Sequence, residues 1–166
     1  EGALDCYFWT CDAKDRDRVG ALGWLQFLEG RDPGYPERAL RADFETIRRK
    51  VAAMREDATT PDTRLADDPM EFNPATVGTL RELMMAGIDP GRGGAPLHCR
   101  LRWFDPQLRR AGIPDDVAAL VDEMTGERVA VTLVNVSQTE SRTVVVQGGA
   151  FAEHDFVRVE TNGNTI

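Results

Sequence analysis

The sequence contains no long apolar run, and no hydrophobic stretch approaches the roughly 20 residues that a membrane-spanning helix needs. It also lacks a CxxC pair. The three cysteines, Cys6, Cys11 and Cys99, are an odd set whose spacing does not indicate a disulfide framework. The first residues do not resemble a signal peptide. We therefore expect a soluble protein in a reducing, cytoplasmic compartment.

Basic residues are in the minority, and lysine is scarce. Lys14 and Lys50 are the only lysines among 20 basic residues, which face 28 acidic ones and leave a formal net charge of -8. The arginines are scattered among acids instead of forming a basic face. Because duplex binding depends on neutralising phosphates, this balance argues against nucleic acid, and equally against an anionic membrane surface. The richness in Arg, Ala and Asp is typical of a high-GC bacterial genome.

The composition is otherwise that of a globular protein, with 42% hydrophobic and 29% charged residues. A chain of 166 residues fits one domain or two small layers that share one core. The aromatic cluster at residues 7–9 follows the first residue almost directly. We interpret this start as that of a piece of a longer polypeptide.

Helical periodicity dominates the first half, and we assign residues 1–87 to a helical part of about three helices. The pattern predicts helices over 15–29, over 37–57, and over 74–86, the last with Asn73 as N-cap and Gly87 at its end. The second is amphipathic, and we expect its apolar face to lie in the core. That face comprises Leu40, Phe44, Ile47, Val51 and Met54.

A Gly/Pro linker at 88–96 separates this part from an antiparallel β part at 97–160. From residue 97 the period is two, which places Cys99, Leu101 and Trp103 on one strand face. Further strands are predicted at 128–136 and 142–147, joined as a hairpin, and at 154–160. Residues 115–124 fit either a helix or a strand, and we favour the strand. Residues 161–166 are expected to be a flexible tail. The fold class is thus α+β, a helical layer followed by a small antiparallel sandwich or sheet.

Two groups of polar residues are candidates for a site. Glu153 and His154 follow the Gly-Gly pair at 148–149, and a general acid or base could be built from them. A hydrogen bond that stabilises a turn is the simpler interpretation, because adjacent residues cannot form a triad among themselves.

The second group, His98, Arg100 and Arg102, lies on one face of the first predicted strand. Arginine binds carboxylates and phosphates bidentately, so this face could bind an anionic ligand. The alternative is a solvated sheet face whose arginines pair with the many acids of the chain.

Metal and cofactor sites are not expected. Cys6, Cys11, His98 and Cys99 could supply four soft ligands, but their spacing matches no zinc module. We predict small buried hydrophobes and a surface histidine instead.

The order of elements carries one resemblance. Amphipathic helices, the loop phrase at 60–64, and the strand phrases at 131–135 and 144–151 resemble the C-terminal end of large bacterial enzymes. These enzymes are built on a toroid of paired helices closed by a β-sandwich, and act on carbohydrates or, in some cases, terpenes. The resemblance implies a supporting C-terminal portion or subunit of a carbohydrate-active enzyme, not catalytic alone. Its partner would be the remainder of a larger polypeptide or another subunit. The alternative is a self-standing binding or assembly module.

Overall fold

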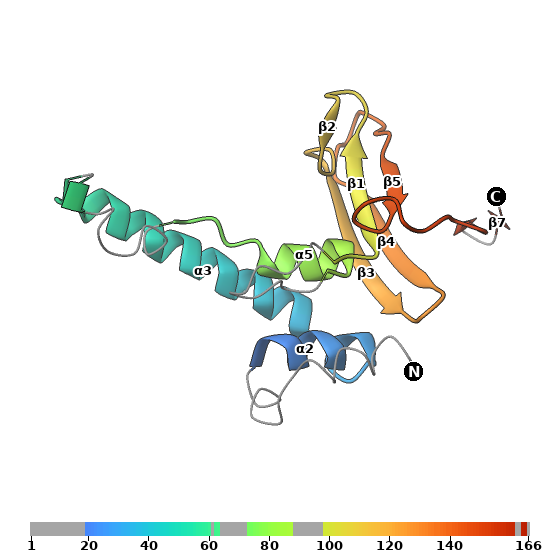
Figure 1. The fold of residues 1–166 in the computed structure, drawn as a ribbon, viewed down its shortest axis with the longest axis horizontal. Helices are drawn as coiled ribbons and strands as arrows, with labels where there is room; N and C mark the ends of the chain where they lie inside the picture. Colours follow the sequence, from blue (N-terminus) through green and yellow to red (C-terminus); the bar gives the residue numbers. More distant parts are fainter. Residues whose placement is uncertain (1–18, 61, 64–72, 88–97, 162–163, 166) are drawn as a thin grey trace.

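The computed structural model describes residues 19–60, 62–63, 73–87, 98–161 and 164–165. Helices occupy the first part and small antiparallel sheets the second, which confirms the α+β class (Figure 1). The predicted linker at 88–96 lies outside the described residues. No helix in the described ranges combines the length and the apolarity needed to cross a membrane.

The first two described helices, α2 (Val19–Leu28) and α3 (Tyr35–Glu56), are joined by a turn that contains Gly30 in a left-handed conformation. Their close approach is at Gly23, where an added Cβ would stand 2.5 Å from the Tyr35 ring. Tyr35 is buried, and its hydroxyl donates to a Glu82 carboxylate oxygen at 3.0 Å. The start of α3 is therefore held between α2 and the third helix.

The third helix, α5 (Gly78–Met85), is shorter than predicted. Asn73 is not its N-cap: the side chain accepts from the Ala75 amide at 3.0 Å in a local turn, and the helix begins only after Val77. At the other end Ala86, not Gly87, adopts the left-handed conformation, with φ 48°. The amides of these last two residues donate back to carbonyls of the helix's final turns, which satisfies its C-terminal end.

The strands form two main sheets. Strand β1 (Leu101–Asp105) lies between β2 (Arg110–Ala111) and β5 (Val145–Gly148), and β3 (Val117–Met124) pairs with β4 (Val129–Asn135). All pairs are antiparallel. Residues 117–124 are thus strand, as we favoured. The predicted hairpin between the strands at 128–136 and 142–147 is wrong, because β4 pairs back onto β3 and β5 crosses to β1.

The connection from β4 to β5 is bonded to the start of β3. Arg142 is largely buried and forms ion pairs with both Asp116 and Glu140. The Val136 amide also donates to the Asp116 carbonyl at 2.8 Å. These bonds hold the connection against the start of β3, and β5 follows it to pair with β1.

Helices and strands share one core. The buried cluster joins Trp24, Leu25, Tyr35 and Leu83 from the helices to Leu101, Trp103, Ala119 and Val121 from the strands. Trp103 also donates its indole N–H to the Met84 carbonyl at 2.7 Å, so the first strand is bonded to the end of α5. The two parts are layers of one body, since neither contains a separate core.

The apolar face of α3 lies largely outside this core, contrary to the sequence-based expectation. Only Tyr35, Ala39 and Leu40 of this helix belong to or pack against the cluster. Farther along, Phe44 is 57% exposed and Met54 45%. The physical reason is visible in Figure 1: the helix runs out beyond α5 and away from the sheets, so the later part of its apolar face lies away from the shared core. Ile47 and Val51, in the middle of the face, are half-buried, whereas Phe44 and Met54 at its edges are exposed.

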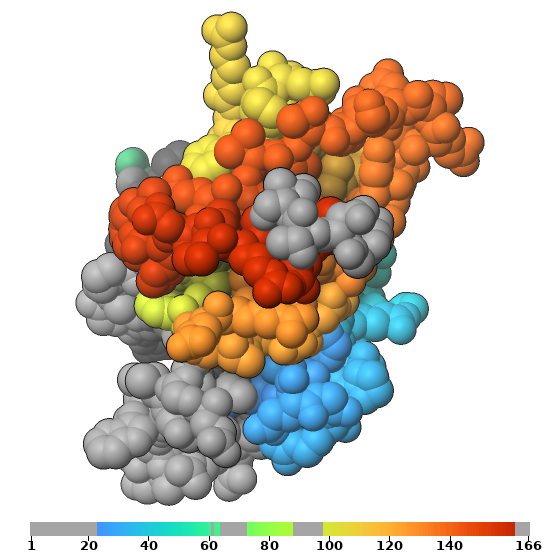
Figure 2. All heavy atoms as spheres, turned by 90° about the vertical axis from the view of Figure 1, so that its right-hand side faces the viewer, coloured from blue at the N-terminus to red at the C-terminus, as the bar shows by residue number. Residues whose placement is uncertain are grey.

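The C-terminal segment departs from prediction in two ways. The expected strand at 154–160 is not formed; His154 makes one isolated bridge to Gly148, and strand structure resumes at β6 (Glu160–Thr161). β6 pairs with β7 (Asn164–Thr165), where we expected a flexible tail. The residues between them are Asn-Gly, a pair that favours tight hairpins. Figure 2 shows the red C-terminal segment at the surface that faces the viewer.

Candidate functional site

The turn that follows β5 contains the first pair of candidate residues. Gly149 and Ala152 both have positive φ, 82° and 62°, which folds residues 148–154 into a compact bend. There is no room for side chains at the start of this bend. A Cβ on Gly148 would lie 2.5 Å from the His154 carbonyl oxygen, and one on Gly149 would lie 2.3 Å from the Glu153 carboxyl carbon.

The Glu153 carboxylate closes this bend. One oxygen accepts from the Phe151 amide at 2.7 Å and the other from the Ala150 amide at 3.2 Å. These backbone hydrogen bonds, that of Phe151 foremost, lower the pKa of Glu153 below its usual range. The group is therefore ionised at neutral pH and has both oxygens engaged within its own turn.

A second set of hydrogen bonds holds two backbone carbonyls of the same bend. Arg102, one of the candidate anion-binding residues, donates to the Ala150 carbonyl at 3.0 Å, and its guanidinium lies 5.3 Å from the Phe104 ring centroid. The Gln147 side-chain amide donates to the carbonyls of Gly149 and Ala150. Polar side chains from β1 and β5 thus hold the backbone of the turn in place.

The structure therefore brings part of the two candidate groups together, since Glu153 and Arg102 both bond to Ala150. His154 and His98 are exposed, and Arg100 is half-buried on the strand side that also carries Arg102. Cys99 is buried on the opposite side; burial, and next the charge of Glu153, raise the pKa of its thiol. A buried, protonated thiol is inert as a nucleophile.

The geometry favours a structural role for this cluster. The Glu153 carboxylate and the Arg102 guanidinium, which could bind a ligand, are hydrogen-bonded to the backbone of the turn. The catalytic assignment of Glu153 and His154 and the anion-binding assignment of His98, Arg100 and Arg102 stay predictions. Sequence reasoning missed Gln147 as part of the cluster. Its position opposite Arg102 in the β1–β5 register was the available signal, but it required knowledge of the strand pairing. Among the described residues no three potential metal ligands gather, and Cys6 and Cys11 lie outside that part of the chain.

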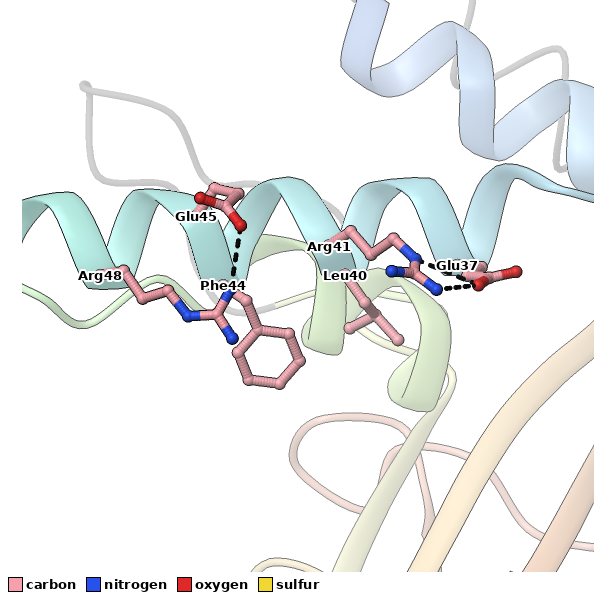
Figure 3. Close-up of a pocket in the computed structure, with 6 residues that line it drawn as sticks. All are labelled: Glu37, Leu40, Arg41, Phe44, Glu45 and Arg48. Atoms are coloured by element: carbon pink, nitrogen blue, oxygen red, sulfur yellow. Dashed lines mark hydrogen bonds and ion pairs between the residues drawn. The ribbon is translucent and has the colours of Figure 1, made fainter.

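The second candidate site is the open side of α3. Leu40 and Phe44 project from the same side of the helix into a shallow pocket, as Figure 3 shows. Ion pairs border it: Arg41 with Glu37 at 2.6 Å and Arg48 with Glu45 at 2.9 Å. The surface has an apolar centre and a charged rim of both signs, which is the composition of a protein-contact surface.

The exposed apolar surface extends beyond this pocket. Val77, just before α5, is 58% exposed, and Leu80 of α5 is 42% exposed. Met54 adds to the exposed side of α3 farther along that helix. Single exposed apolar residues are common on protein surfaces. Leu40, Phe44 and Met54, which share one side of the helix, are called the α3 surface below.

Comparison with known proteins gives one match. Residues 10–81 match the family model described as a domain of unknown function, DUF8034. The match covers α2, α3 and the start of α5, and the strands lie outside it. No curated protein matches the chain, and no solved structure does. The matched segment is therefore the helical one that carries α3, and the family description assigns it no activity.

Proposed function

We propose that this chain is a supporting, non-catalytic portion of a larger bacterial protein and that the α3 surface packs against helices of the remainder. The observation that carries the proposal is the exposed apolar face of a long, regular helix. Phe44 and Met54, at the two edges of that face, are 57% and 45% exposed. Burying one such side chain contributes roughly 1.5–3 kcal/mol, so the face has a large free energy to gain from a partner.

The kind of partner follows from the shape of the surface. A straight α-helix offers ridges and grooves that another helix fills, and the mixed ion pairs at the rim suit an amphipathic helix with charges of both signs. α2 and α3 already form one helical pair. A further helix on the open side would continue the same packing.

The resemblance to helical-toroid enzymes supplies the class of the host. In that class the last paired helices pack on the toroid and a β region closes the chain, which is the order found here. On this proposal the host is a bacterial carbohydrate-active enzyme, and its catalytic residues lie in the remainder. The class rests on the resemblance alone.

An assembly module is the second candidate, and the end of β4 favours it. Leu133 and Val134 point to opposite faces of the strand, yet they are 47% and 48% exposed, and Val136 is 66% exposed. Exposed apolar side chains on both faces of one strand end offer contact area to a partner. This end of β4 could bind a separate protein without any helical host.

A matched pair of substitutions tests the proposal. Phe44→Asp places a charge in the α3 surface, whereas Ala42→Asp adds the same charge at an exposed position about 160° around the helix. Both variants are made in the natural full-length polypeptide and in the isolated chain, and thermal melting is measured for each. We expect only Phe44→Asp, and only in the full-length protein, to lower the melting temperature clearly.

Two results would contradict the proposal. Equal effects of Phe44→Asp in the full-length and the isolated protein would mean that the α3 surface has no partner there. Turnover of glycosides, esters or phosphates by the isolated chain, abolished by Glu153→Gln or His154→Ala, would show that the chain is catalytic itself.

A further inference from the structure

The outer edge of β5 is open, and the hydrogen-bond pattern shows which groups lie along it. The Gly149 amide donates to the Arg100 carbonyl at 2.8 Å, which makes these two residues a hydrogen-bonded pair. In an antiparallel ladder such pairs recur every second residue, so Gln147 and Val145 also bond to β1. The backbone groups of Gly148 and Val146 therefore point the other way, to an edge that carries no further named strand in the described part of the chain.

One backbone pairing on that edge is already formed. His154 pairs with Gly148 in an antiparallel bridge, and the His154 amide donates to the Gly148 carbonyl at 3.3 Å. The turn between them is the one that Glu153, Arg102 and Gln147 hold in place. A rigid turn followed by one antiparallel residue pair is the start of a β-hairpin. This pair fixes the register in which the residues after His154 can pair with β5.

The segment after this pair has the composition of a strand but not the pairing. Phe156, Val157 and Val159 are residue types enriched in strands, and they are 48%, 98% and 44% exposed. Continuation of the register places Phe156 opposite Val146, which packs against the core on the same sheet face as Trp103. It places Val157 opposite Val145, itself 47% exposed on the outer face.

From these observations we infer that the outer edge of β5 is a docking site for residues 155–158 of the same chain. The segment closes onto the edge as a fourth strand of the β2-β1-β5 sheet, in the register set by Gly148 and His154. Closure gives the open backbone groups of Val146 their partners in Phe156 and reduces the exposure of Phe156 and Val157. In the structure, the pair of Gly148 and His154 is formed and the remaining pairs of this strand are not.

Engineered disulfides test both the docking and its register. In this register residues 145 and 157 form a non-hydrogen-bonded pair, whose close Cβ atoms suit a disulfide. The variant Val145→Cys/Val157→Cys is oxidised under mild conditions, and the link is identified by peptide mass mapping, which separates it from the native cysteines. The control, Val145→Cys/Arg158→Cys, moves the second thiol by one residue to the opposite face.

We expect the 145–157 link to form within one chain at least about tenfold faster than the control link, because only the first pair meets the geometric requirement. Equal rates, or a 145–157 link that forms only between two chains, would overturn the inference. The second result would assign the segment to the edge of another copy.

Amide exchange of the unsubstituted protein gives an independent measurement. Docking protects the Phe156 amide, which points to β5, but not that of Val157, which points away; we expect at least about a tenfold difference in exchange rate. Equally fast exchange at both positions would overturn the inference even if the cysteine variants failed to fold.

Discussion

Leu83 and Leu80 lie on the same short helix, and their comparison tests whether α5 joins the helical layer to the sheets. Leu83 is 2% exposed within the shared core, whereas Leu80 is 42% exposed. Leu→Ala at a fully buried site costs about 2–5 kcal/mol, from lost burial and from the cavity left behind. At the half-exposed site we expect about 1 kcal/mol or less, since little cavity forms there.

These values convert into a measurable difference. For a domain of this size 1 kcal/mol lowers the melting temperature by about 2–4 °C, so Leu83→Ala should lower it by roughly 10 °C and Leu80→Ala by about 3 °C or less. Melting is followed by far-ultraviolet circular dichroism and by tryptophan fluorescence. Circular dichroism reports on the secondary structure, and fluorescence reports on the shared core, which contains Trp24 and Trp103.

A shared core also predicts a single unfolding transition. Both signals should change in one transition in the wild type and in Leu83→Ala, because no layer has a core of its own. Equal effects of the two substitutions would mean that the burial of Leu83 is assigned incorrectly. Separate transitions of the two signals would refute the single shared core.

Three other outcomes follow from the site. Gly149→Ala should destabilise the protein by about 1–2 kcal/mol in urea unfolding, because φ is 82° and the new Cβ would meet the Glu153 carboxylate; an unchanged midpoint would contradict the turn geometry. Since the pKa of Glu153 is lowered in the folded state, its bonds stabilise the fold fully above the reference value of 4.5 and are lost as pH falls through the folded value. The amide chemical shifts of Ala150 and Phe151 should therefore titrate below that pH, and not in Glu153→Gln. Chelation with EDTA should leave the melting temperature unchanged, because we predict no metal site; a fall that zinc reverses would refute this prediction.

The sequence predicted those elements whose pattern is decided locally. The 3.6-residue period of α3 and the alternation around Leu101 are set by each segment alone, and both are confirmed. The period of α3 marks an apolar face but cannot say what covers it. That depends on how far the helix extends past α5, and the face proved to be largely open around Phe44.

Pairing was harder to predict than the elements themselves. β5 pairs with β1 across the whole β3–β4 hairpin, and Arg142 bonds to Asp116, 26 positions earlier in the chain. The start of α5 was missed because Asn73 uses its side chain for a local turn, an alternative that the same residue type offers with equal ease. Glu153 was identified as a residue of interest, but its bonds to the backbone amides of its own turn could not be anticipated without the bend at Gly149.

Hydrogen exchange along α3 tests the proposed support role most directly. The exchange of amides in residues 44–56 is measured in the isolated chain and in the natural full-length protein. If helices of the remainder cover the α3 surface, these amides exchange at least about tenfold more slowly in the full-length protein, because opening of the helix then requires separation of the packed partner. Equal exchange in the two proteins would contradict the account, since the face around Phe44 would then stay open in its natural setting.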